Sequence, residues 1–339
     1  MAGSLVQLRS GDLDTHLAKS LAPVYAVHGD EPLLALEAAD AVRAAARKRG
    51  FTEREVFEVG RGFDWSELRN SLQSLSLFAT KKIVELRLPG GKPGTQGGPA
   101  LAAYFAQPSP DTLLLVSLPR LDKKTQDSEW FRGLADAGVV IDVWPLDRAR
   151  LPSWISERLG RQGQRASREV LDFLAARVEG NLLAAHQEVQ KLALLAPAGE
   201  LALDTVEGAV ADVARYNPQD AAEALLAGDT GRYVRIIEGL RGEGEAPTFV
   251  LFIVSNALFV LASAHASGSI DSAFQQHRVY GRPLQAALRS ALARFRPRAV
   301  EEAIADAAAI DRAIKGVRMR DPWEEFIALG LKLAGGSKA

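Results

Sequence analysis

Cysteine is absent from the 339 residues of this chain, which excludes disulfide bonds, thiol nucleophiles and thiolate metal ligands. Metal-ligand spacing is also missing, because the five histidines (His16, His28, His186, His265 and His277) are scattered along the chain. The sequence contains no G-x-S-x-G motif, so a nucleophile elbow is not supported. We therefore expect no catalytic residue, no metal and no cofactor.

The chain also has no large excess of charge of either sign. The formal net charge is −1, which does not indicate a nucleic-acid binder by overall balance. The first residues, Met1-Ala2-Gly3-Ser4, lack a basic region followed by an apolar core, so no secretory signal is expected. Together with the missing cysteine, which suits a reducing compartment, this predicts a cytoplasmic protein.

Long hydrophobic runs are limited to residues 248–266. This stretch is long enough to span a membrane, but Ser255, Asn256 and His265 interrupt it and no basic cluster flanks it closely. A helix that is apolar on most sides is typical of the buried centre of a helical domain. We predict a buried helix and no membrane contact.

Apolar runs and amphipathic stretches alternate over the first third of the chain. Strands are predicted at 23–27, 55–59, 82–87, 112–116 and 139–143, and helices at 31–49, from Asp64 to about 75, at 100–107 and at 130–137. A loop rich in glycine and proline opens at Pro89. Such alternation predicts an α/β domain with a mostly parallel sheet and helices on its faces.

The turn after the first predicted strand is where related folds hold phosphate. A phosphate loop needs glycines, a lysine and a hydroxyl in the pattern G-x-x-x-x-G-K-[S/T]. Here Gly29 is followed by Asp30 and Glu31, and the last three positions of the pattern are Leu34, Ala35 and Leu36. Apolar residues cannot neutralise phosphate or bind magnesium, so the sequence predicts a degenerate loop that binds no nucleotide.

The remaining two thirds of the chain are predicted to be helical. We expect a domain over 1–145, a small helical domain over 146–213 and a second helical domain over 214–339. The last contains a stripe of arginines without an intervening acid: Arg278, Arg282, Arg289, Arg294, Arg296 and Arg298. This stripe is a candidate for contact with a phosphate backbone, and the alternative is a solvated or subunit-contact face.

The stretch Gln73-Ser74-Leu75-Ser76-Leu77-Phe78 lies between a predicted helix and a predicted strand. Leu77 and Phe78 have two interpretations. They are either ordinary core residues at a helix end, which the local pattern alone favours, or an apolar plug for a partner's pocket.

Short motifs along nearly the whole chain resemble those of one family. They are Gly29-Asp30-Glu31-Pro32-Leu33-Leu34, Asp64-Trp65, Ser74-Leu75-Ser76-Leu77-Phe78-Ala79, Pro110-Asp111-Thr112-Leu113-Leu114-Leu115, Gly180-Asn181-Leu182-Leu183-Ala184-Ala185, Gln187-Glu188 with Lys191-Leu192, Gly228-Asp229, Ile314-Lys315-Gly316 and Asp321-Pro322-Trp323. In this order and spacing they resemble the delta subunit of the bacterial DNA polymerase III clamp loader.

The resemblance implies an AAA+ type module, a helical lid and an all-α collar that packs with the other clamp-loader subunits into a hetero-pentamer. It also implies a subunit of the polymerase holoenzyme that does not hydrolyse ATP itself. Such a subunit binds the sliding clamp (beta) and helps to open it for loading onto primer-template DNA. The clamp-binding role falls on Leu77 and Phe78, with Gln73, Leu75 and Ser76 in support. With this layout around them, the plug interpretation of Leu77 and Phe78 is favoured.

Three points stay open at this stage. Gln73 is either a contact with the clamp or a helix residue that fits the pattern. An active AAA+ or P-loop ATPase with an unusual loop is one alternative function, although Leu34-Ala35-Leu36 argues against it. A regulatory scaffold of another complex that kept the same fold is the other.

Overall fold

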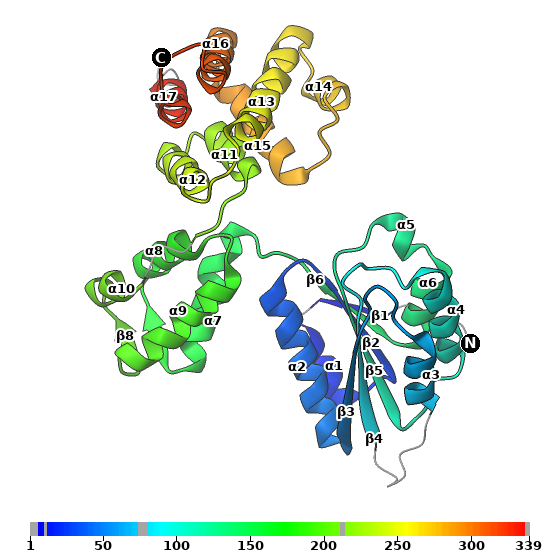
Figure 1. Cartoon of the computed structure of the whole chain (residues 1–339). Helices are drawn as coiled ribbons and strands as arrows, with labels where there is room; N and C mark the ends of the chain where they lie inside the picture. Colours follow the sequence, from blue (N-terminus) through cyan, green and yellow to red (C-terminus); the bar gives the residue numbers. More distant parts are fainter. Residues whose placement is uncertain (1–5, 10–11, 74–80, 211–213, 336–339) are drawn as a thin grey trace. The chain divides into compact units, whose positions relative to one another are not determined.

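The computed structural model of the chain describes residues 6–9, 12–73, 81–210 and 214–335 (Figure 1). The chain divides into two compact units, Met1–Glu157 and Arg158–Ala339. The division into three domains predicted from the sequence stays a prediction, and its second border lies next to residues 211–213, outside the described ranges.

A six-stranded parallel sheet forms the centre of the first unit. Its strands are β1 (Val6–Arg9), β2 (Val24–Gly29), β3 (Phe51–Glu58), β4 (Lys81–Arg87), β5 (Thr112–Leu118) and β6 (Val139–Val143). They lie in the order β1-β6-β2-β5-β4-β3, and every neighbouring pair is parallel. The mostly parallel sheet that the sequence predicts is therefore confirmed.

Helices cover both faces of the sheet (Figure 1). They are α1 (Leu13–Lys19), α2 (Pro32–Lys48), α3 (Trp65–Gln73), α4 (Gly94–Ala106), α5 (Lys123–Gln126) and α6 (Glu129–Ala137), followed by a 3-10 turn at Arg148–Arg150. The alternation of side chains along β2 builds two cores. Val24 and Ala26 join the core under α3, α4 and α6, whereas Tyr25 and Val27 join the core under α1 and α2.

Strand β1 and the start of α4 are two of the features that differ from the sequence expectation. Strand β1 was not predicted, because a four-residue segment carries too little pattern to stand out. Helix α4 begins at Gly94, six residues before the predicted start, although glycine and proline are poor helix formers. The glycine at position 97 of this helix has a packing reason, because a Cβ there would lie 2.2 Å from the Trp65 ring of α3. Close packing of the two helices therefore requires glycine at this place.

The parallel sheet separates two candidate regions. Gly29 ends β2 and marks the carboxyl edge, where ligands bind in open α/β sheets. Gln73 ends α3 and Lys81 begins β4, so both lie at the opposite, amino edge. The degenerate phosphate loop and the two described borders of the stretch 74–80, Gln73 and Lys81, thus belong to opposite edges of one sheet.

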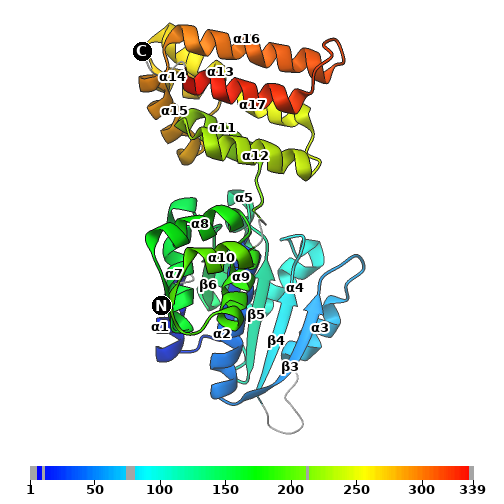
Figure 2. The ribbon, with the colours of Figure 1, turned by 90° about the vertical axis from the view of Figure 1, so that its left-hand side faces the viewer.

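The second unit is mostly helical. Its elements are α7 (Leu151–Arg161), which crosses the border between the units, β7 (Gln164–Ala166), α8 (Arg168–Val178), α9 (Leu182–Leu195), β8 (Gly199–Leu201), α10 (Leu203–Ala209), α11 (Pro218–Ala227), α12 (Thr230–Gly242), α13 (Pro247–Ser267), α14 (Ile270–Gln276), α15 (Arg282–Arg294), α16 (Pro297–Ile314) and α17 (Pro322–Gly335). Strands β7 and β8 form a small parallel pair, and α16 and α17 run side by side (Figure 2). The predicted fold class, a parallel α/β module followed by a helical region, is confirmed.

Helix α13 runs through the core of the helices that follow residue 217. It contacts α11, α14, α15 and α16, and Val254, Leu258 and Leu261 on it are fully buried. Among the described residues, it is the helix long and apolar enough to cross a membrane, and 44% of its most apolar window is buried. The predicted packing of this helix into a core is confirmed, but Phe249, Phe252 and Phe259 on its outer side remain exposed.

Candidate functional site

Most of the predicted plug lies outside the described residues. Leu75, Ser76, Leu77 and Phe78 belong to the stretch 74–80, and the structure describes only its borders. Gln73, the last residue of α3, is exposed. Its exposure fits a contact with a partner and equally fits an ordinary helix end, so the role of Gln73 stays a prediction.

Helix α3, which leads to this stretch, is fixed at its beginning and along its inner face. The Asp64 carboxylate accepts hydrogen bonds from the Ser66 backbone N–H at 2.8 Å and from Ser66 Oγ at 2.6 Å. The bonds from Ser66 lower the pKa of Asp64. Leu68 and Leu72 are buried in the core beneath the helix. The predicted helix start at Asp64 is therefore confirmed, and its apolar spacing places Gln73 on the outer side.

One carboxylate connects the two borders of the stretch 74–80. Glu55, on the edge strand β3, accepts a hydrogen bond from Ser71 Oγ at 2.6 Å through one oxygen. Its other oxygen lies 3.2 Å from Lys82 Nζ on β4. The bond from Ser71 holds the pKa of Glu55 below its usual value against partial burial, and Lys82 adds to this effect. Sequence analysis gave these three residues no role.

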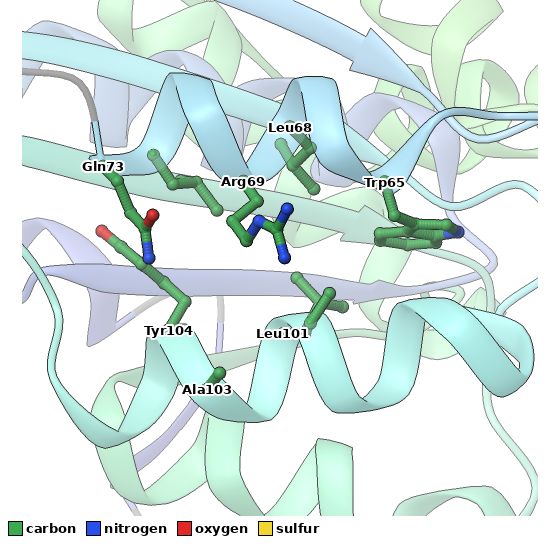
Figure 3. A pocket seen from close by; sticks show the side chains of 9 residues that line it. Trp65, Leu68, Arg69, Gln73, Leu101, Ala103 and Tyr104 are labelled. Carbon is green, nitrogen blue, oxygen red and sulfur yellow. The ribbon is translucent and has the colours of Figure 1, made fainter.

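A small apolar pocket lies between α3 and α4, next to Gln73 (Figure 3). Gln73 and Tyr104 lie at one end of it and Trp65 at the other, with Arg69 between them. Burial raises the pKa of Tyr104 to about 12, so its hydroxyl stays protonated and donates to the Thr112 carbonyl. The pocket follows α3 and ends beside Gln73, the last described residue before the stretch 74–80.

The degenerate phosphate loop is packed against the protein itself. Glu31 caps α2, where its carboxylate accepts from the Leu33 backbone N–H at 3.4 Å, and burial raises its pKa. Leu34 and Ala35 pack against the core beneath α2, whereas Leu36 is 54% exposed. Neither a cation nor a hydroxyl occupies these three positions, so they offer no side chain of the kind that holds phosphate and magnesium in a phosphate loop.

Gly29 has a structural explanation that involves no phosphate. Its φ is +151°, and a Cβ at this position would lie 1.6 Å from the Val143 carbonyl oxygen on β6. Any other residue would therefore push the two neighbouring strands apart. The glycine that looks like the start of a phosphate loop is needed here by strand packing.

At the carboxyl edge of the sheet, near Gly29, the loops that follow neighbouring strands interact with one another. Asp30 accepts from the Arg120 backbone N–H at 3.0 Å, which ties the loop after β2 to the loop after β5. The Arg120 guanidinium lies 4.9 Å from the centre of the Trp144 ring, which follows β6. His28 Nε2 lies 2.9 Å from Asp142 Oδ1, and both side chains are buried. Three loop regions that would surround a nucleotide are thus held to one another directly.

Metal chemistry finds no support in the described part of the chain. No group of three or more histidine, aspartate or glutamate side chains there is arranged to hold a metal ion.

The predicted arginine stripe is divided between structural and surface roles. Arg294 donates to the Ala227 carbonyl at 2.6 Å and to the Leu226 carbonyl, at the end of α11. Arg289 pairs with Asp271 at 2.6 Å and Arg298 with Glu302 at 3.0 Å. The structure therefore gives Arg294 a role in holding α11. Within the stripe, between Arg278 and Arg282 in the sequence, Tyr280 is 80% exposed, and the sequence pattern gave no sign of a role for it.

Comparisons with known proteins agree on one family. Residues 25–143 match the family model described as DNA polymerase III, delta subunit. The DNA polymerase III subunit delta of Escherichia coli (strain K12) is 33% identical over 284 residues, which are 81% of this chain and 81% of that protein. The subunit of the same name from Haemophilus influenzae is 32% identical over 252 residues, 74% of this chain and 73% of that protein.

A solved structure extends the likeness to the fold of nearly the whole chain. The Bacillus subtilis DNA clamp loader delta protein covers 96% of this chain and 99% of its own length, with a TM-score of 0.51 and 18% identity. The fold and the loop region after β2 define the class: a parallel α/β module without the side chains of a phosphate loop, followed by helical regions. This chain belongs to the family of DNA polymerase III delta subunits.

Proposed function

We propose that this chain is a non-hydrolysing subunit of a clamp loader that binds the sliding clamp and helps to open it. The observation that carries the proposal is the stretch Gln73–Phe78 in a member of this family. The stretch follows helix α3, which Leu68 and Leu72 fix to the core on one side, so the chain enters the stretch from a rigid base at Gln73. One or two apolar anchors in a pocket commonly supply most of the binding energy of an interface.

The mechanism uses binding energy in place of chemistry. Leu77 and Phe78 dock beside an interface of the clamp ring and stabilise its open or strained form. A ligand shifts such an equilibrium only by the difference between its affinities for the two states, so the tip must bind the open ring more tightly. ATP bound by partner subunits would then determine when the tip is accessible.

The degenerate loop predicts that the isolated chain does not bind ATP. Leu34, Ala35 and Leu36 occupy the positions where a phosphate loop has glycine, lysine and a hydroxyl residue, and Asp30 would repel phosphate at this edge. In isothermal titration we expect a dissociation constant for Mg·ATP weaker than about 1 mM, with an ATPase subunit of the same loader as the positive control. Micromolar binding by the wild-type chain would instead support the alternative of an active ATPase.

Partner subunits are proposed to contact the helical region after residue 213. Phe249, Phe252 and Phe259 lie at helical spacing on the outer side of α13 and are 44%, 64% and 47% exposed. Exposed aromatic residues on one helix face are typical of protein interfaces. This supports a collar role in a hetero-pentamer, with a lid formed by the helices before residue 211. We propose that this complex is a component of the polymerase III holoenzyme in the cytoplasm.

Contact with primer-template DNA is proposed for the surface around the arginine stripe. Arg278 and Arg282 flank the exposed Tyr280, and the combination of cationic and aromatic side chains suits phosphate contact and base stacking. Arg294 is the least suitable member, because carbonyls of α11 occupy its guanidinium. Arg289, Arg296 and Arg298 complete the proposed surface.

Co-purification tests the proposed function as a whole. The tagged full-length chain is used to capture the sliding clamp and the clamp-loader ATPase subunits of the same organism, each supplied as a purified protein. We expect both to be retained at low micromolar concentration, in keeping with transient interfaces of this kind. If neither is retained, the chain serves a different complex, as the scaffold alternative holds.

A further inference from the structure

A buried ion pair connects the two groups of helices in the second unit, α7–α10 and α11–α17. The helices of the second group share one apolar core, whose buried residues lie between Ala221 and Leu333, and no described residue of α7–α10 belongs to it. Glu179, which follows the last residue of α8, meets Arg232 of α12. The arginine donates to its Oε1 at 3.0 Å through Nε and at 2.5 Å through Nη2. A directional polar contact thus links the two groups where that core does not.

Backbone contacts join the same two groups at the same place. The Arg215 N–H donates to the Glu179 carbonyl at 2.8 Å, and a Cβ at Gly180 would lie 1.9 Å from the Arg215 carbonyl oxygen. Gly180 has a φ of +72°, which glycine adopts without strain. The hydrogen bond of the Arg215 amide exists only while residues 179 and 215 are in contact. This amide therefore reports whether the two groups are joined here.

A second carboxylate lies next to Arg232 within its own group of helices. Oδ1 of Asp220, in the first turn of α11, is 3.8 Å from Arg232 Nη2. The Asp220 side chain is 27% exposed and that of Glu179 is 10% exposed, so water already reaches the second acid. The Asn217 N–H donates to the other Asp220 oxygen at 2.8 Å and holds this carboxylate in place. Arg232 could therefore leave Glu179 without becoming a buried, unpaired charge, which is the usual cost of breaking such a pair.

We propose that Glu179 and Arg232 form a latch between α8 and α12, and that Arg232 opens it by exchanging Glu179 for Asp220. In the closed state the arginine joins the two groups of helices. In the open state it pairs with an acid of its own group, while Glu179 becomes hydrated. Because the guanidinium has a carboxylate partner in both states, the latch is a two-state element of the kind that conformational changes use.

The place of the latch in the chain gives it a consequence for the proposed function. The residues proposed to bind the clamp precede Glu179 in the sequence, whereas the helices proposed to contact partner subunits follow residue 213. An open latch allows α8 to turn away from the helices that partner subunits would hold. This consequence rests on the proposed function, but the latch itself does not, because its test needs neither the clamp nor a partner.

Hydrogen exchange of the Arg215 amide, followed by nuclear magnetic resonance on the full-length chain, measures opening of the latch. When reclosing is faster than chemical exchange, the exchange rate is proportional to the open fraction. We expect Glu179→Gln to speed exchange of this amide about 10-fold, because charge-assisted hydrogen bonds become neutral ones. Asp220→Asn should slow it about 3- to 10-fold, because the open state loses the carboxylate that receives Arg232. Asparagine keeps an oxygen for the Asn217 N–H.

Two other amides distinguish opening of the latch from unfolding of either group. The Tyr233 N–H donates to the Asp229 carbonyl within α12 at 2.9 Å, and the Ala185 N–H donates to the Asn181 carbonyl at the start of α9 at 2.9 Å. Both should exchange at the wild-type rate in each variant. Glu238→Gln, which removes an exposed acid from α12, is the matched control and should leave the Arg215 amide unchanged.

The opposite signs of the two effects decide the proposal. A cluster that only stabilises the fold predicts faster exchange of the Arg215 amide in both Glu179→Gln and Asp220→Asn, and that result would overturn the latch. An unchanged rate in Glu179→Gln would overturn it as well. If Glu179→Gln unfolds the second unit and speeds all three amides, Asp220→Asn decides alone: slower exchange of the Arg215 amide supports the latch, and an equal or faster rate contradicts it.

Discussion

Replacing Leu77 and Phe78 with alanine is expected to have the largest effect on clamp binding. Each anchor should contribute about 2–4 kcal/mol, as central apolar residues of interfaces do, so each single variant should bind about 30- to 1000-fold more weakly. The double variant should show no measurable binding at micromolar clamp. Surface plasmon resonance with the immobilised clamp measures the change, and Leu36→Ala, an exposed leucine on α2, is the control.

The same variants decide between the two interpretations of the Leu-Phe pair. As core residues, Leu77 and Phe78 would lower the melting temperature on truncation and leave clamp affinity of the folded chain unchanged. As a plug, they would leave the melting temperature nearly unchanged and abolish binding. A thermal unfolding scan of each purified variant, beside the binding curve, therefore identifies which interpretation is wrong.

Arg232→Ala is expected to have the largest effect on stability. Arg232 on α12 donates through Nε at 3.0 Å and through Nη2 at 2.5 Å to one oxygen of Glu179, and both residues are nearly fully buried. Removing the arginine leaves the glutamate buried without its cation. Breaking a buried ion pair in this way costs about 3–5 kcal/mol. We expect a loss of this size in the free energy of unfolding of the second unit, measured by urea denaturation of the full-length chain.

Two further variants make this expectation specific to the ion pair. Arg235→Ala removes an exposed arginine from the same helix and should change the free energy of unfolding by less than about 0.5 kcal/mol. Arg232→Met combined with Glu179→Leu removes both charges and should regain most of the lost stability. Equal stabilities for Arg232→Ala and Arg235→Ala would show that the buried pair contributes nothing.

The Arg232 pair also lies among other acids of the second unit. Asp220 Oδ1 is 3.8 Å from Arg232 Nη2, and burial raises the pKa of both Asp220 and Glu223. Glu179 directly follows the last residue of α8, and Arg232 belongs to α12. This ion pair therefore joins two helices that are distant in the sequence. The backbone of Glu179 adds a second connection, since the Arg215 N–H donates to the Glu179 carbonyl at 2.8 Å.

Local pattern was sufficient for much of the fold. Strands β2, β5 and β6 were predicted because each is a mostly apolar run buried on both faces, and β4 because Ile83, Val84 and Leu86 give it an apolar centre. The edge strand β3 was predicted to begin four residues late, at Glu55, because Thr52, Glu53 and Arg54 add no apolar residue to the alternating pattern. The start of α4 was misplaced, because only the Trp65 ring above Gly97 explains glycine inside that helix.

For the candidate site, the sequence by itself determined which side chains of a phosphate loop are missing after Gly29, and it determined the family. The residues after Gly29 exclude a phosphate loop by their side chains alone, and the ordered motifs gave a resemblance that the relatives confirm. These conclusions need only residue types at short spacing, and short spacing is what a sequence records directly.

The tertiary structure alone decided how distant residues meet. In the sequence, Glu55, Ser71 and Lys82 are three polar residues on three separate elements, and nothing in their spacing predicts one connected group. The same holds for Gly29 against Val143 and for Arg294 on the carbonyls of α11. The physical reason is that strand order and helix packing bring such residues together through long-range burial of apolar surface, and a local pattern does not contain the identity of the partner.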